Sequence, residues 1–130
     1  MRYSVPDWWS IDVPDSWCVT EHPECTTFEP QASESAFQVS AHRKHGDVTD
    51  DDLRDFAGDT PLKPIALPHF TGFESTSTEG QLFTRKFWLR AGAFMLFVTY
   101  ICPLGARGRE DSILEEMLSS LSSAHVTKGA

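Results

Sequence analysis

The alternation of apolar and polar residues predicts that most of this chain folds as strands. Ala36–Arg43 carries an apolar side chain at every second position, which is the pattern of a strand with one buried face. Prolines interrupt residues 61–68, so we expect a stiff crossing there without a helix, and a loop over residues 76–80. Four further segments are predicted as strands: Trp8–Val13, Trp17–Thr20, Cys25–Glu29 and Phe70–Ser75.

The strongest hairpin signal lies in the second half of the chain. Gln81–Arg90 and Ala93–Ile101 are predicted to pair, with the turn at Ala91-Gly92. The second of these strands is apolar on both faces, which is typical of a central strand that is covered from both sides.

Two capping-box spacings predict helices. Thr49 is followed three residues later by Asp52, which predicts a short acidic helix that ends at Gly58. Ser112 and Glu115 have the same spacing and precede an apolar stripe at helical period. The stripe comprises Ile113, Leu114, Met117, Leu118 and Leu121.

These elements predict an α+β fold, an antiparallel sheet of about six strands with the acidic helix and the C-terminal amphipathic helix packed on it. The chain has 130 residues and shows no repeat or linker, so we expect a single domain over residues 1–130. Its ordered core is expected to span about residues 8–122, and the small residues of 123–130 predict a frayed tail.

The charge of the chain argues against two classes of partner. The net charge is −8 and the calculated pI is about 4.9, whereas nucleic-acid binding and docking on anionic membranes both need a basic surface. The longest apolar run, Ala91–Ile101, is too short to span a bilayer, so no membrane insertion is expected.

The cysteines and the first residues predict a cytoplasmic location. The N-terminal segment has no apolar signal region, and three cysteines are an odd number for a disulfide framework. We therefore expect reduced thiols, with Cys18 and Cys25 across or diagonal to one another in a hairpin as small buried side chains.

An acidic stretch at residues 46–59 is the first candidate binding site. Asp50, Asp51, Asp52 and Asp55 are interpreted as a possible partner-binding patch, and the alternative is that they only complement the positive end of a helix. A calcium loop is disfavoured because the EF-hand glycine and its alternating oxygen ligands are missing.

Metal and catalytic motifs are incomplete in this sequence. His42 and His45 with Asp47 do not share a strand face, and His22 near Cys18 lacks a CxxC spacing. No nucleophile elbow or phosphate-binding loop is present. The sequence therefore predicts no catalytic residue, no metal site and no cofactor.

The pair Trp8 and Trp9 is the second candidate. Strand alternation cannot bury both rings in one core, so Trp8 is interpreted as an exposed anchor for a partner protein. The alternative is that Trp8 packs under the N-terminal segment.

The order of the elements resembles the PsbP/Mog-type superfamily over about residues 8–122. The match rests on Pro14, Trp17, Gly72, Leu118, Ser120 and Leu121. The resemblance implies an antiparallel sheet flanked by helices, in a class of binding proteins that includes photosystem extrinsic subunits, Ran-binding factors and chaperones for type VI secretion effectors. In the Ran-binding branch an acidic surface engages the partner, and Asp50–Asp55 is the conceivable equivalent here.

Together these points predict a non-catalytic cytoplasmic domain that binds another protein, as an adaptor or an accessory chaperone such as one for secretion effectors. A homodimer is a further possibility. An immunity-type protein that neutralises a basic toxin is one alternative. The other is a small-molecule-binding or enzymatic domain with a pocket near His69, Phe70 and Phe73, onto which His69, Arg85 or Tyr100 would converge.

Overall fold

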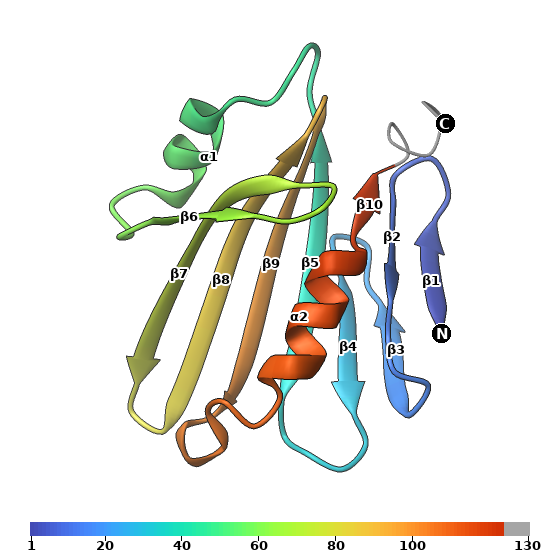
Figure 1. Ribbon diagram of the computed structural model, residues 1–130, viewed down its shortest axis with the longest axis vertical. Coiled ribbons are helices and arrows are strands. Elements are labelled where there is room, and N and C mark those ends of the chain that lie inside the picture. Colours follow the sequence, from blue (N-terminus) through green and yellow to red (C-terminus); the bar gives the residue numbers. More distant parts are fainter. Residues whose placement is uncertain (124–130) are drawn as a thin grey trace.

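The main sheet of the molecule has seven antiparallel strands in the order β3-β4-β5-β9-β8-β7-β6. The computed structural model describes residues 1–123, and Figure 1 shows the arrangement of the elements. The sheet is larger than the predicted one of about six strands. Its strands are β3 (Trp17–Glu21), β4 (Thr26–Pro30), β5 (Ala36–Arg43), β6 (Lys63–Ala66), β7 (Thr71–Glu79), β8 (Leu82–Ala91) and β9 (Phe94–Pro103).

A second sheet of three strands follows the order β1-β2-β10. Its strands are β1 (Arg2–Val5), β2 (Trp9–Asp12) and β10 (Ser122–Ser123). β1 was not expected, so the folded part begins before residue 8. Trp8 lies in the turn between β1 and β2, where its N–H donates to the Val5 carbonyl at 3.0 Å and Asp7 has a φ of 67°. Apart from Ser123, the tail predicted to fray lies outside the described residues.

The two helices begin in different ways. α1 (Asp50–Ala57) has the predicted capping box, because the Thr49 hydroxyl accepts from the Asp52 N–H at 3.2 Å and the Thr49 N–H donates to the Asp52 carboxylate at 2.8 Å. The box predicted at Ser112 is wrong, since α2 (Asp111–Ser120) already includes Ser112 and has no side-chain cap. A short 3-10 helix, η1 (Leu104–Ala106), precedes α2.

Two strands depart from the prediction at the β6 side of the sheet. The proline-rich crossing contains β6, and its Pro64 is accommodated because β6 is an edge strand. The loop expected at 76–80 is wrong, because β7 continues to Glu79 and turns at Gly80-Gln81. In the next hairpin Ala91 pairs with Phe94, so the turn lies at Gly92-Ala93, one residue beyond the predicted turn.

Strand β9 lies fourth of the seven strands, which confirms its predicted central position. Its alternate residues from Leu96 to Cys102 are buried in the larger core. On this face, which we call the α2 side, α2 and the small sheet cover the main sheet (Figure 1). The fully buried side chains here include Ile11, Phe28, Phe37, Phe87, Leu89, Leu96, Leu114 and Leu121.

A smaller core lies on the opposite face, which we call the α1 side. It joins Leu53 of α1 and Val48 to Phe73 of β7 and Trp88 of β8. α1 packs mainly on β8 and β7, and its Phe56 also reaches Phe97 of β9 and His42 of β5. Most of this face over β3, β4 and β5 receives no helix in the described chain (Figure 1).

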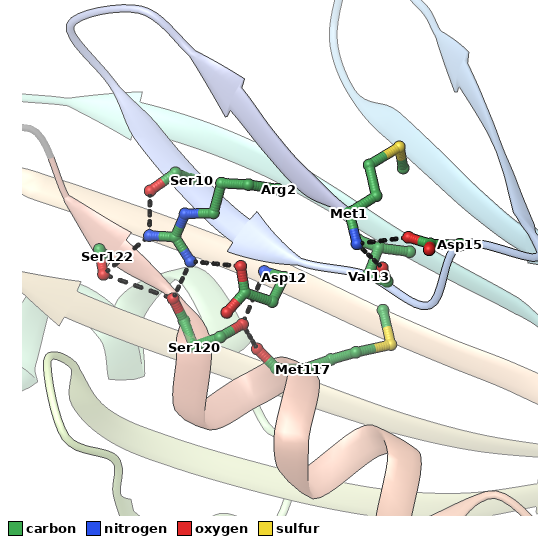
Figure 2. Close-up of polar contacts among 9 residues, drawn as sticks. All are labelled: Met1, Arg2, Ser10, Asp12, Val13, Asp15, Met117, Ser120 and Ser122. Atoms are coloured by element: carbon green, nitrogen blue, oxygen red, sulfur yellow. Dashed lines mark hydrogen bonds and ion pairs between the residues drawn. The ribbon is translucent and has the colours of Figure 1, made fainter.

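Arg2 connects the small sheet to the end of α2 (Figure 2). Its guanidinium donates to the Asp12 carboxylate at 3.0 Å, to Ser10 Oγ at 2.7 Å and to the Ser120 carbonyl at 3.2 Å. A basic side chain at a helix C-terminus supplies donors for carbonyls that lack helical partners. The contact thereby holds the first strand and the last helix together.

Gly72 marks the closest backbone approach between β7 and β8. It is buried opposite Leu89, and a Cβ atom at this position would lie 1.9 Å from the Trp88 carbonyl oxygen. A side chain of any size therefore requires the two strands to separate.

We expect Gly72→Ala to lower the free energy of unfolding by about 2–4 kcal/mol, because backbone atoms must move to admit the methyl group. Gly105→Ala is the matched control, since a Cβ there meets nothing within 4 Å. Urea unfolding followed by circular dichroism measures both variants. Equal stability of the two variants would contradict the close approach.

Candidate protein-binding face

The four aspartates predicted as a partner-binding patch all lie on α1, but three of them form ion pairs within the chain. Asp50 pairs with Arg90 at 2.8 Å, and Asp52 pairs with Lys44 at 2.6 Å. Asp51 pairs with Arg54 at 3.1 Å on the exposed surface of the helix. Much of the local negative charge is therefore balanced by basic residues of the same chain.

Asp52 is the most strongly held of these carboxylates. The Lys44 ammonium and the backbone N–H of Thr49 hold the pKa of Asp52 below its usual value of 3.8. Asp55 is exposed and has no ion pair within residues 1–123. Of the four aspartates, Asp55 is thus the one whose charge stays available to a partner.

Trp8 lies on the α2 side, away from the acidic helix. It is half-buried, its ring centroid is 6.1 Å from that of Phe94, and the Arg43 guanidinium lies 4.6 Å from the centre of its ring. Arg43 also donates to the Asp7 carbonyl at 2.8 Å. The predicted site residues therefore do not form one patch, because Trp8 and α1 occupy opposite faces of the main sheet.

An aromatic row that the sequence analysis did not identify runs along the α1 side. The ring centroids of His42 and Phe56 are 5.7 Å apart, those of Phe56 and Phe97 are 5.4 Å apart, and those of Phe97 and Trp88 are 5.5 Å apart. The row joins β5, α1, β9 and β8. The register of β5 with β9 places His42 and Phe97 on the same face, and the position of Phe56 beside them depends on how α1 returns to the sheet.

This row borders an open groove of about 570 Å³, which we call the α1-side groove. Its lining residues are Glu24, Cys25, Gln38, Ser40, His42, Phe56, Phe97 and Thr99. Phe56 is 47% exposed, and beyond the groove Ile101 is 37% exposed. Large apolar side chains that gather on one uncovered sheet face are typical of an interaction surface.

Polar groups frame the groove. Gln38 donates to Cys25 Sγ at 2.7 Å, and Glu24 and Cys25 lie at the turn between β3 and β4. Cys18 lies opposite Glu29 and is exposed, so the predicted buried neighbourhood of Cys18 and Cys25 is wrong. Within residues 1–123, no group of three or more His, Cys, Asp or Glu side chains is arranged to hold a metal ion.

The residues proposed for a small-molecule pocket are separated in the structure. Phe70 belongs to the larger core and Phe73 to the smaller one, while His69 is exposed between β6 and β7. Arg85 and Tyr100 do lie opposite one another on β8 and β9. His69 does not join them, because its turn adjoins the far end of the β7–β8 pairing.

Arg85 and Tyr100 hold the start of α2 against the sheet. The Tyr100 hydroxyl donates to Glu110 at 2.6 Å, and Arg85 forms ion pairs with Glu74 at 3.4 Å and with Asp111 at 3.6 Å. Burial and the hydrogen bond to Glu110 raise the pKa of Tyr100 well above its usual value. Both side chains thus have structural partners.

The fold matches those of solved structures. A crystal structure from Bacteroides thetaiotaomicron has a TM-score of 0.77 and 18% sequence identity, over 94% of this chain and 47% of that one. The solution structure of cyanobacterial PsbP (CyanoP) from Synechocystis sp. PCC 6803 has a TM-score of 0.54 and 14% identity, over 95% of this chain and 91% of that one. The chain has a PsbP-like fold.

This result confirms the resemblance predicted from the sequence, and at these identities it establishes the fold alone. The chain spans about half the length of the Bacteroides protein. No protein-family model and no curated protein matches the sequence. No helix within residues 1–123 has the length and apolar character needed to cross a membrane.

The ion pair at Asp52 predicts a pH-dependent contribution to stability. Because folding lowers the pKa of Asp52, its contribution is present above the unfolded pKa and is lost as the pH falls through the folded pKa. We therefore expect Asp52→Asn to lower the melting temperature at pH 7 and to differ less from the natural protein at about pH 3.

Asp55→Asn is the matched control on the same helix, since Asp55 is exposed and lacks such a pair within the described chain. Thermal unfolding followed by circular dichroism at both pH values provides the comparison. A difference between Asp52→Asn and the natural protein that is the same at both pH values would rule out this role of the charge.

Proposed function

We propose that this chain is a non-catalytic protein-binding domain that holds a partner on its α1-side groove. The observation that carries the proposal is the aromatic row of His42, Phe56 and Phe97 on an uncovered part of the main sheet. Aromatic side chains on an open face provide a large contact area with few rotatable bonds.

The charges around the groove favour an apolar segment that also carries lysine or arginine. Glu24 lines the groove, and Asp55 precedes Phe56 in α1. The net charge of −8 adds a long-range attraction for a basic partner. The ion pairs of Asp50, Asp51 and Asp52 leave these three residues a smaller part in binding than the aromatic row.

A role as an adaptor or an accessory chaperone agrees with such a groove, because either role needs an exposed apolar surface and no reactive centre. Three free cysteines support a reducing compartment such as the cytoplasm. This chain matches 47% of the Bacteroides chain, so the Bacteroides protein has a further region outside the match.

Site-specific photo-crosslinking in cells tests the binding face. We expect a photoreactive amino acid at position 56 to give a discrete crosslinked product, because Phe56 is 47% exposed beside the groove. The same group at Glu115, which is exposed on α2, is the control and should give no such product. Mass spectrometry then identifies the partner.

The identified partner is next tested for binding to Phe56→Asp, which should bind at least tenfold more weakly because a carboxylate replaces the central ring of the row. A melting temperature close to that of the natural protein shows that this variant is folded. Equal crosslinking at positions 56 and 115, or unchanged binding by the folded variant, would remove the groove as the binding face.

A further inference from the structure

The outer edge of the main sheet has no strand partner along the second half of β7 within the described chain, although Pro61 and Leu62 lie near its first residues, Ser75 and Thr76. β6 pairs only with Thr71–Glu74, whereas β7 continues to Glu79. Ser75–Glu79 pairs with β8 on one side, and no strand in the described part of the chain pairs with its other side. Figure 1 shows this half of β7 as the free margin of the sheet, beyond the end of β6.

This edge lacks the features that usually prevent sheet edges from pairing. On the same side of the sheet, β6 carries Lys63 and Pro64, which block the addition of a strand. Ser75–Glu79 has neither residue type, and its register with β8 is continuous, without a bulge. Its backbone is therefore open to a further strand on its free side.

We propose that this edge pairs with the same segment of a second copy of the chain, which gives a symmetric dimer with one continuous sheet. When the two copies of Ser77 lie opposite one another in an antiparallel pair, all five residues of Ser75–Glu79 in each copy are paired. It places Ser75 opposite Glu79, Thr76 opposite Thr78, and Ser77 opposite its own copy. The contact is self-complementary, as twofold symmetry requires, and it contains cross-strand hydroxyl pairs of a favourable kind.

Charge complementarity favours a second copy as the occupant. Lys86 of β8 lies beside Ser75, and it has no ion pair within residues 1–123. In the dimer, Glu79 of the second copy lies next to Ser75 on the face that also carries Lys86, because directly opposite residues share a face. Two strand spacings of about 5 Å separate Glu79 from Lys86, a gap that these long side chains bridge across the small serine.

The size of the contact predicts a weak dimer. Five paired residues bury much less than the roughly 1,600 Å² of a standard stable interface, so association needs a high protein concentration. The edge is separate from the α1-side groove, and the dimer therefore does not depend on the proposed function.

Sedimentation equilibrium of the full chain at increasing concentration tests this dimer. We expect reversible monomer–dimer association by the natural protein and a monomer for Ser77→Lys, because the substitution places two like charges opposite one another. Ser16→Lys adds the same charge to an exposed loop serine and should still dimerise. Circular dichroism confirms that each variant is folded.

A charge exchange tests the register. Glu79→Lys should weaken association by bringing two lysines together, and the double variant Glu79→Lys/Lys86→Glu should restore it. A natural protein that stays monomeric at all concentrations overturns the proposal, even if the edge later proves to bind a strand of another protein. A dimer that Ser77→Lys leaves unchanged, or a double variant that is no better than Glu79→Lys, also overturns it.

Discussion

Both faces of β9 are apolar, so the molecule has to supply cover on both sides of its central strand. On the α2 side, one helix and the small sheet provide this cover, and Arg2 joins these two elements. On the α1 side a helix of eight residues provides cover mainly over β7 and β8. The α1-side groove is the part of the sheet that this short helix leaves open.

The length and position of α1 thus decide where the candidate binding face lies. Ion pairs from Asp50 to Arg90 and from Asp52 to Lys44 hold the start of the helix to the neighbouring strands. Leu53 is fully buried on the sheet, and Phe56 is left with about half of its surface exposed. The aspartates that resembled a binding patch therefore position the aromatic ring that we assign to binding.

Local patterns were sufficient to predict both helices and the strands of the main sheet other than β6, since alternation along β5 and the capping box at Thr49 depend on neighbouring residues only. The seven-stranded sheet was underestimated because Pro64 obscured β6, and β7 was predicted too short because the polar residues Thr76–Glu79 resembled a loop. The site was harder to predict, because Phe56, Phe97 and His42 meet only through the tertiary path of the chain. No local signal distinguishes a free aspartate from one that is paired with Arg90, 40 residues away.

One face of the main sheet is sealed by α2 and the small sheet, whereas the other stays open around Phe56 and Ile101. Hydroxyl-radical footprinting with mass spectrometry measures the exposure of these side chains directly in the dilute, unbound protein. We expect rapid oxidation of Phe56 and Ile101, and protection of Phe28, Phe37 and Phe87, which are fully buried. Protection of Phe56 and Ile101 equal to that of Phe37 would instead mean that both faces of the sheet are sealed.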